Sequence, residues 1–467
     1  MQMGFAGDVA EAAALLANCG EATIISHIDA DGITSEAILA QALARAEVVV
    51  RTHFVRQLEP LTMGTIPRNG SLKIFSDLGA GQQNLLMEHG FRPEEVLIVD
   101  HHVSTPCSVD YFQVNCLPYG HEKMSAAGVC YLIAREMDES NRDLAKLAVI
   151  GNVGDMMARE DCRLVGIARE LADDGVQHGS IATITRTLNC YGMSTRPLHI
   201  ALAYNDDPVI PGISNSPNGA LTFLQRLGIP LKDDSGRWLV WEELPQEDQR
   251  KVVSALFQQL IVHNVPTDRL LAEAYVFPDE PHRTPLRNAS EFATLLNACG
   301  RWARPKIGGS ICRGDRGALY REAEHMLAHH RSMIRELLNF ILDKGVRTLS
   351  HLQYIHVGSK FPDTIIGIGA GMALSKLDVG KPILVMCELP EDPRVTKVSM
   401  RTTERLVSAG IDLQRALIDA SATCGGAAGG HKIAAGAFIP REAEKDFVGH
   451  VNRVLAEQSS ASRAGHC

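Results

Sequence analysis

The segment 23–35 holds three side chains of the kinds that bind divalent metal ions. His27, Asp29 and Asp31 occupy alternate positions after the apolar run 22–25. Successive side chains of a strand point to opposite faces of a sheet, so this alternation predicts that the three share one face. Open α/β sheets place their ligands at the carboxyl ends of their strands. The segment therefore predicts part of a metal site, provided that other strands deliver matching groups.

Three further apolar runs end in carboxylate or imidazole groups. The runs 71–79, 95–102 and 147–155 end at or near Asp77, the triplet Asp100, His101 and His102, and Asp155. Carboxylates brought together in a partly buried site repel one another, and divalent cations are the usual means of offsetting that repulsion. The mixed Asp and His set favours Mn²⁺ over Zn²⁺, Co²⁺ or Mg²⁺. There are enough ligands for two cations, the arrangement that serves in-line displacement at phosphorus.

Two segments near the C-terminus have the composition of an anion-binding site. The strand-like segment 397–401 places Ser399 and Arg401 on one face. The segment 424–432, C-G-G-A-A-G-G-H-K, is rich in glycine and ends in His431 and a lysine. Its glycines allow close approach of the backbone, and consecutive N–H groups can cradle an anion. The alternative interpretation of these glycines is a tight turn or a flexible hinge.

The segment 300–316 is locally basic in a chain whose net charge is −9. Such a segment can contact a phosphate backbone, and a tryptophan in it can stack on a base. The alternative is a solvated loop with a buried tryptophan. The candidate contacts with nucleic acid are Arg301, Trp302, Arg304 and Arg313.

The order and spacing of these motifs resemble a known family. H-I-D-A-D-G, S-D-L-G, D-H-H and the G-D at 154–155 resemble the four motifs of the DHH phosphoesterase superfamily over residues 20–160. The C-terminal pair resembles the DHHA1 substrate-binding domain, with an S-x-R strand followed by a G-G-x-x-G-G-H segment. The matching positions are Ser399, Arg401, Gly425, Gly426, Gly429, Gly430 and His431. Within this superfamily the chain is most similar to archaeal RecJ-like single-strand exonucleases, including relatives that associate with the GINS complex of the replicative helicase.

The resemblance implies a role for each residue of the motifs. One cation would be held by His27, Asp29 and Asp77, and the other by Asp31, Asp77, His101 and Asp155. Asp77 would then bridge the two. Asp100 would orient an imidazole, and His102 would face the scissile phosphate. The implied cofactors are two divalent cations, with Mn²⁺ favoured and Mg²⁺ or Co²⁺ as alternatives.

The resemblance implies an exonuclease on single-stranded DNA or RNA, with roles in DNA repair or replication. A second interpretation is a phosphodiesterase of short oligonucleotides or cyclic dinucleotides. A third is a GINS-binding scaffold of the replisome with secondary nuclease activity. A family II pyrophosphatase fits less well, because its C-terminal domain lacks the G-G-x-x-G-G-H segment.

Alternating apolar runs and helical stripes predict an α/β fold. The expected parts are a mostly parallel-sheet DHH domain at 1–190, an inserted middle region at 191–320, a long connecting helix at 321–347, and a smaller α/β DHHA1 domain at 348–467. The helices expected within them lie at 8–19, 35–46, 81–89, 125–137, 163–190, 244–262, 290–299, 318–344, 364–377, 407–420 and 442–456. The segment 103–121 is expected to be irregular. The expected strands of the last domain lie at 351–357, 382–386, 397–401 and 434–439.

The composition is typical of a protein of a reducing compartment that has no membrane span. The 467 residues include 11 cysteines without a C-x-x-C pair, which argues against a disulfide framework and a structural zinc site. The first residues lack a basic region followed by an apolar core, and no apolar run reaches about 18 residues. We therefore expect a cytoplasmic protein without a membrane span.

Overall fold

The computed structural model describes residues 3–181, 183–205, 207–389 and 392–464. The chain forms two compact units, Met1–Leu327 and Ala328–Cys467. The boundary falls inside the long helix α13 (Ala318–Lys344), which the sequence predicts at these positions. Leu327 of this helix packs in the main core of the first unit, and Leu337 and Ile341 pack in a core of the second.

The first unit contains a parallel five-stranded sheet in the order β2-β1-β3-β4-β5. Its strands are β1 (Glu21–Ser26), β2 (Val49–Phe54), β3 (Leu72–Ser76), β4 (Val96–Asp100) and β5 (Phe112–Asn115). Ser26 at the end of β1 lies opposite Ser76 of β3, and Ser76 lies opposite Val99 of β4. The ends of three strands therefore meet at one edge, and the predicted parallel α/β sheet is confirmed.

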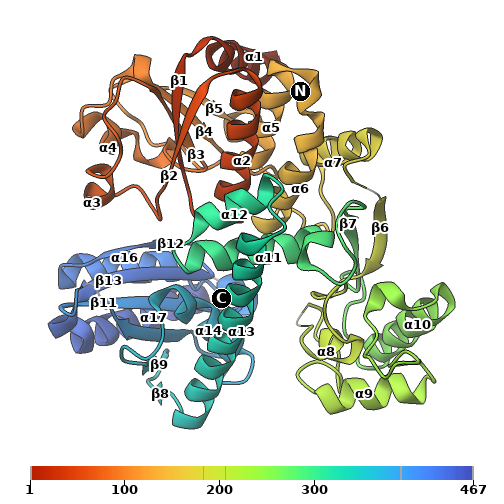
Figure 1. The fold of residues 1–467 in the computed structure, drawn as a ribbon. Helices are drawn as coiled ribbons and strands as arrows, with labels where there is room; N and C mark the ends of the chain where they lie inside the picture. The colour runs from red at the N-terminus through yellow and green to blue at the C-terminus, as the bar shows by residue number, and fades with distance from the viewer. Residues whose placement is uncertain (1–2, 182, 206, 390–391, 465–467) are drawn as a thin grey trace. The chain divides into compact units, whose positions relative to one another are not determined.

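Helices cover both faces of this sheet (Figure 1). They are α1 (Met3–Asn18), α2 (Ala30–Arg45), α3 (Pro60–Met63), α4 (Gln83–Glu88) and α5 (Ala126–Met137). Helix α6 (Ala145–Gly154) packs on α2 and α5, and α7 (Gly166–His178) packs on α6. Ile24 and Ile74 belong to the core on the side of α1, α2 and α5, whereas their neighbours Ile25 and Phe75 belong to the core on the side of α3 and α4. This alternation explains why the strands read as continuous apolar runs, since both faces are buried.

Three expectations for the segment between residues 103 and 190 are wrong. The run 147–155 is helix α6 and not a strand, because a short apolar run that is buried all round has no period that separates the two. The segment 103–121 is not wholly irregular, since it contributes the edge strand β5, whose pairing with β4 no local pattern announces. The predicted helix 163–190 ends at His178, before a strand that begins at Thr183.

The middle region has its own apolar core around Leu202, Trp241 and Leu256. Its elements and those that follow are β6 (Thr183–Leu188), α8 (Leu198–Ala203), α9 (Pro217–Arg226), α10 (Gln246–Val262), β7 (Leu271–Val276), α11 (Ala289–Arg301) and α12 (Pro305–Cys312). Strands β6 and β7 form an antiparallel pair. The predicted helices at 244–262 and 290–299 correspond to α10 and α11. The basic segment after them contains helix α12, so it is not simply a solvated loop.

The second unit contains a mixed six-stranded sheet in the order β12-β13-β11-β10-β9-β8. Its strands are β8 (Arg347–Thr348), β9 (Gln353–His356), β10 (Ile383–Glu388), β11 (Val395–Arg401), β12 (Ala427–Gly430) and β13 (Ala434–Pro440). Its helices beyond α13 are α14 (Asp363–Leu374), α15 (Glu404–Ser408), α16 (Leu413–Cys424) and α17 (Glu444–Ala464). The predicted single helix at 407–420 is wrong, because Gly410, with φ of +92°, separates α15 from α16.

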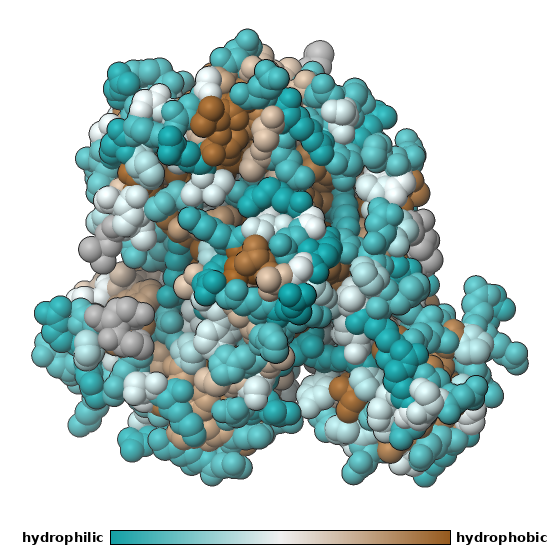
Figure 2. Space-filling view, in the orientation of Figure 1, coloured by the Kyte–Doolittle hydropathy of each residue, from teal (hydrophilic) through white to brown (hydrophobic). Residues whose placement is uncertain are grey.

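The surface drawn in Figure 2 is mainly hydrophilic, with apolar areas that are small and separate. Within the described residues, no helix is both long and apolar enough to cross a membrane.

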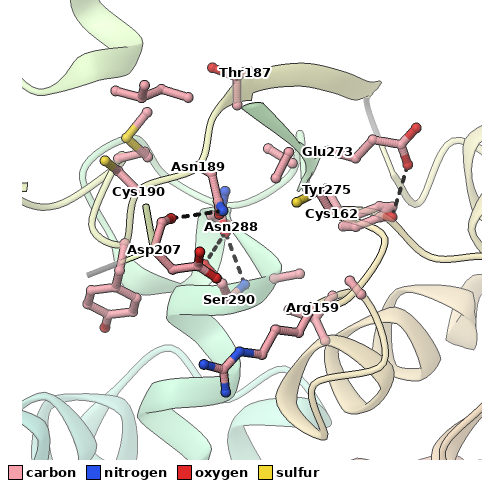
Figure 3. A pocket seen from close by; sticks show the side chains of 18 of the residues that line it. Arg159, Cys162, Thr187, Asn189, Cys190, Asp207, Glu273, Tyr275, Asn288 and Ser290 are labelled. Carbon is pink, nitrogen blue, oxygen red and sulfur yellow. Dashed lines mark hydrogen bonds between the residues drawn. The ribbon is translucent and has the colours of Figure 1, made fainter. Parts of the chain in front are cut away.

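One cavity of about 430 Å³ lies within the first unit (Figure 3). Its walls come from the end of α6, from β6 and β7, and from the start of α11.

Candidate metal centre

His27, Asp29 and Asp31 lie close together, but they do not lie on one strand as their spacing suggests. Strand β1 ends at Ser26, so His27 and Asp29 lie in a connection and Asp31 lies in the first turn of α2. Asp29 is the N-cap of α2, and its Oδ1 accepts a hydrogen bond from the N–H of Gly32 at 3.0 Å. Helix α2 therefore begins at Ala30 and not near Ser35, and the alternation on a strand is wrong. The strand-to-helix turn brings the same side chains to one place.

Helix α11 supports this turn from a distant part of the chain. The carboxamide oxygen of Asn297 accepts a hydrogen bond from the N–H of Ala30 at 2.9 Å. A Cβ at Gly300 would overlap the carbonyl oxygen of Ile28, so only glycine lets α11 approach this closely. No sequence pattern marks Asn297 or Gly300, because the contact joins residues about 270 positions apart.

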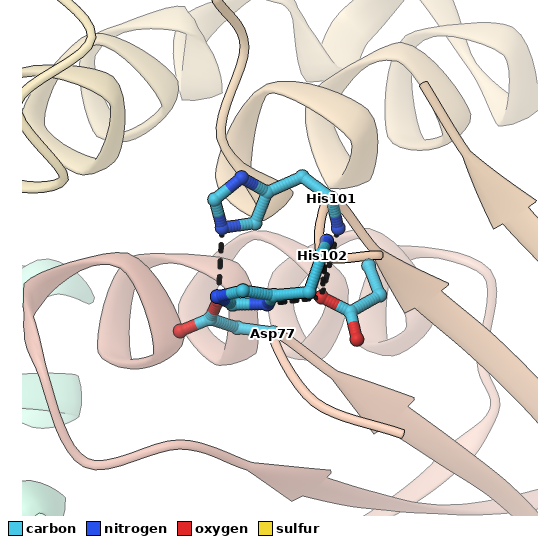
Figure 4. Close-up of side chains that lie close together, drawn as sticks. Asp77, His101 and His102 are labelled. Carbon is cyan, nitrogen blue, oxygen red and sulfur yellow. Dashed lines mark hydrogen bonds and ion pairs between the residues drawn. The ribbon is translucent and has the colours of Figure 1, made fainter. Parts of the chain in front are cut away.

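Two donor groups share one carboxylate. His27 Nδ1 lies 3.0 Å from Asp29 Oδ2 and 3.3 Å from Asp77 Oδ2. His101 Nε2 lies 3.5 Å from the other oxygen of Asp77, Oδ1, as the dashed line in Figure 4 shows. The second group is completed by Asp155 and Asp31, whose Oδ2 atoms lie 3.4 Å and 3.8 Å from His101 Nε2. All six predicted ligands therefore lie in one cluster, with Asp77 between its two halves.

The backbone fixes several of these side chains. Asp31 accepts hydrogen bonds from the N–H groups of Ala126 and Ala127 at the start of α5, each at 2.9 Å. Asp77 has φ of +60°, a left-handed conformation that a non-glycine residue rarely adopts. Asp155 is the C-cap of α6. The carboxylates thus come from strand and helix ends that are held by hydrogen bonds and packing.

Asp100 organises the two histidines that follow it. It is fully buried and accepts hydrogen bonds from the N–H of Ala80 at 3.0 Å and the N–H of His101 at 2.8 Å. Its Oδ1 also lies 2.8 Å from Nδ1 of His102. The other ring nitrogen of His102 is left for an external partner, and 57% of that side chain is exposed.

Burial and mutual repulsion shift the pKa values of the cluster. Burial, and then the charges of Asp31 and Asp29, raise the pKa of Asp77 well above its usual value. Burial and the charge of Asp31 raise the pKa of Asp155 to about 8. Burial opposes protonation of His27, but the charges of Asp29 and Asp77 outweigh it and raise the pKa of that imidazole. Without a cation, the cluster therefore retains protons.

Two buried atoms of the cluster fit a bound cation. Asp77 Oδ2 and His101 Nε2 are buried and have ion-pair contacts but no hydrogen bond among the described residues. A buried polar atom without a hydrogen bond costs free energy, and coordination to a metal ion would use the lone pairs of both atoms. Oxygen and imidazole donors of this kind suit Mn²⁺ and similar divalent ions.

The predicted anion site of the second unit has a different form from the expected loop. The glycine segment is the edge strand β12, which pairs with β13 and turns at His431. Gly425, with φ of +74°, ends α16, and a Cβ at Gly426 would lie only 2.5 Å from the carbonyl oxygen of Phe438. Gly429 and His431 are exposed. These glycines therefore provide a helix end and a hairpin, and they leave one strand edge open.

Ser399 and Arg401 lie on β11 in the same sheet. A Cβ at Gly367 of α14 would overlap the Arg401 guanidinium, so glycine at this position allows α14 to pack closely on β11. Arg401 donates a hydrogen bond to the carbonyl oxygen of Met400 at 2.8 Å, but it forms no ion pair with a carboxylate of the described residues. Burial lowers its pKa, and an anion would offset the cost of burying it.

The residues of the basic segment have partners within the protein. Arg313 pairs with the fully buried Glu36 at 2.8 Å, and Arg304 pairs with Glu322 at 2.9 Å. Arg301 and Trp302 also take part in interactions. Their contact with nucleic acid stays a prediction.

Sequence models of three domain families match the chain. The DHH family N-terminal domain matches residues 21–152, the DHH-CID domain residues 190–272, and the DHHA1 domain residues 351–457. The chain therefore contains DHH, DHH-CID and DHHA1 domains. The predicted resemblance to DHH and DHHA1 proteins is confirmed, and the middle region of this DHH protein has a domain type of its own.

Known proteins resemble this DHH protein over nearly its whole length. An uncharacterised protein of Methanocaldococcus jannaschii is 28% identical over 458 residues, which is 95% of each chain. RecJ from Thermus thermophilus, solved with Mn²⁺, has a TM-score of 0.58 at 19% identity, and the match covers 96% of this chain and 55% of RecJ. Cdc45 from Entamoeba histolytica has a TM-score of 0.63 at 12% identity and is covered to 99%, with 97% of this chain. The fold is RecJ-like, and the chain spans about half the length of the Thermus enzyme.

Proposed function

We propose that this DHH protein is a two-metal phosphodiesterase that removes nucleotides from an end of single-stranded DNA or RNA. The observation that carries the proposal is the position of Asp77, whose two oxygens face two separate donor groups. That arrangement matches a pair of cations that share one carboxylate, which is the design suited to displacement at phosphorus.

We assign the donor groups as the resemblance to the DHH superfamily implies. His27, Asp29 and Asp77 would hold one cation. The other would be held by Asp31, Asp77, His101 and Asp155. When bound, the cations would make a water molecule more acidic and offset the negative charge that develops on the phosphate. Mn²⁺ is the proposed ion, with Mg²⁺ or Co²⁺ as alternatives, and RecJ has been solved with Mn²⁺ and with Mg²⁺.

His102 would bind the scissile phosphate. Its hydrogen bond to Asp100 raises its pKa, so the ring holds a proton on each nitrogen more readily near neutral pH. Nδ1–H is committed to Asp100, and Nε2–H would donate to a phosphate oxygen. Asp100 stays charged, because its hydrogen bond with His102 outweighs burial and lowers its pKa. Asp100 therefore acts as a positioning residue for His102.

The second unit would bind the strand. Ser399, Arg401, the open edge at Gly429 and the ring of His431 offer donors to a phosphate. The absence of a described carboxylate partner for Arg401 supports this assignment.

A scaffold role is a second candidate. Helix α10 ends in Ile261 and Val262, which are 64% and 75% exposed. Exposed apolar side chains of this kind fit a protein partner, for which GINS subunits of the replicative helicase are the candidate. A pull-down with these subunits, comparing the full chain with Ile261→Ser/Val262→Ser, tests this role separately from catalysis.

A time course with Mn²⁺ tests the proposed activity. The substrates are single strands tens of nucleotides long, of DNA and of RNA, each labelled at one end or the other, with a dinucleotide as control. A ladder of products that shorten from one end supports an exonuclease. Cleavage of the dinucleotide alone supports a phosphodiesterase of short oligonucleotides, and no cleavage with any divalent ion contradicts the proposal.

A further inference from the structure

The cavity of the first unit adjoins the metal centre through helix α6. Val153 and Met156, which line the cavity, flank the metal-site residue Asp155 in sequence. Ser290 at the start of α11 lies on another wall, and Asn297 of the same helix supports the His27 turn. The cavity and the candidate metal centre therefore share two helices.

One arginine in the cavity wall has no acidic partner among the described residues. Asp207 pairs with Arg269 at 2.6 Å, and Glu273 pairs with Arg169 at 2.7 Å. Both acidic side chains in the wall are thus neutralised by arginines. Arg159 also lines the cavity, is exposed, and forms no side-chain ion pair or hydrogen bond with a described residue. The positive charge of Arg159 therefore favours a ligand with an anionic group.

The wall also offers a stacking surface and an acceptor. The Tyr204 side chain is 53% exposed and lines the cavity beside Tyr191. The guanidinium of Arg196 lies 4.6 Å from the ring centre of Tyr191 and 5.6 Å from that of Tyr204. The positive charge of Arg196 therefore attracts both rings. Asn189 donates through Nδ2 to two backbone carbonyls, and its Oδ1 accepts nothing from the described residues.

We propose that this cavity binds a nucleotide of a single strand beyond the two that flank the scissile bond, with its base against Tyr204 and a phosphate at Arg159. The inference rests on the proposed nuclease function and adds a binding subsite to it. A volume of about 430 Å³ lies within the range of roughly 300–1,000 Å³ that small-molecule sites occupy. The free oxygen of Asn189 suits the amino group of a base such as cytosine.

The ratio of kcat/KM for a pentanucleotide of cytidines to that for a dinucleotide tests the inference. Arg159→Ala and Tyr204→Ala should each lower this ratio about tenfold, since stacking on an aromatic ring and contact with a phosphate both contribute at this scale. Tyr204→Phe keeps the ring and should keep the ratio. Arg163→Ala removes an exposed charge from the same segment, outside the cavity wall, and is the matched control.

The outcomes separate this inference from the proposed function. If the wild-type protein cleaves both substrates and all variants keep its ratio, the subsite is wrong and the nuclease stands. A fall in the ratio for Arg159→Ala and Tyr204→Ala, but not for the two controls, supports the subsite. If the wild-type protein cleaves neither substrate, anisotropy of the labelled pentanucleotide decides: equal affinity of wild type and Tyr204→Ala overturns the subsite.

Discussion

The metal centre and the glycine hairpin of the DHHA1 domain hold their functional groups in opposite ways. In the metal centre, Asp31 and Asp100 are buried and receive backbone N–H donors. In the hairpin, Gly429 and His431 are exposed, and the edge of β12 is open. The comparison teaches that, under the proposed function, the chemical step uses fixed side chains, whereas binding of a strand uses accessible backbone. The predictions below test that difference.

The largest effect is expected from Asp77→Asn. The change removes the shared ligand, so hydrolysis of a single strand should fall at least about 1,000-fold, equivalent to roughly 4 kcal/mol of transition-state stabilisation. The metal-free variant should unfold at the same temperature as the wild type or higher, because a buried carboxylate that repels Asp31 and Asp29 is lost. Paired activity and thermal unfolding assays measure both. Retained activity contradicts the assignment of Asp77.

A smaller effect is expected from Asn297→Ala, which touches no ligand. Loss of the hydrogen bond to Ala30 frees the turn that carries His27 and Asp29. Mn²⁺ affinity should fall about 10-fold to 100-fold, the usual cost of removing a group that supports a ligand. Calorimetric titration measures it, with the exposed Asn18→Ala as control. An unchanged affinity would show that α11 does not position the site.

Arg401→Ala should act on binding. KM for a long strand should rise about tenfold while kcat changes little, because a contact of equal strength in the ground state and the transition state affects KM alone. Arg453→Ala removes an exposed charge from α17 of the same unit and serves as control. A fall in kcat with KM unchanged would mean that Arg401 acts in the chemical step. The proposed difference between the metal centre and the DHHA1 domain would then be wrong.

The smallest effect is a pH dependence of stabilisation by Mn²⁺. The raised pKa of Asp155, about 8, means that the metal-free protein gains stability from this proton at low pH and loses it as the pH rises toward 8. A cation must displace the proton, so the rise in unfolding temperature on adding Mn²⁺ should be larger by a few degrees at about pH 8 than at about pH 6. A larger rise in unfolding temperature at about pH 6 than at about pH 8 would contradict competition between Mn²⁺ and the proton on Asp155.

The side chains that the sequence singles out as metal ligands lie in one cluster, and each of their motifs follows an apolar run. Local patterns reveal that Asp77 and His101 follow strands, and the parallel sheet then brings the strand ends together. What the patterns do not reveal depends on distant partners. Strand β5 forms because β4 offers it a partner, α6 replaces a predicted strand because it is buried all round, and Asn297 contacts Ala30 across most of the chain. The wall residues of the cavity come from five separate segments and carry no motif.

Metal stoichiometry tests the central claim most directly. Mn²⁺ titration of the metal-free protein, followed by calorimetry and electron paramagnetic resonance, should give two ions per chain with spectra of a coupled pair. Asp77→Asn should lose the coupled pair. A wild-type protein that binds a single Mn²⁺, or two that are uncoupled and unaffected by Asp77→Asn, would contradict a centre built around one shared carboxylate.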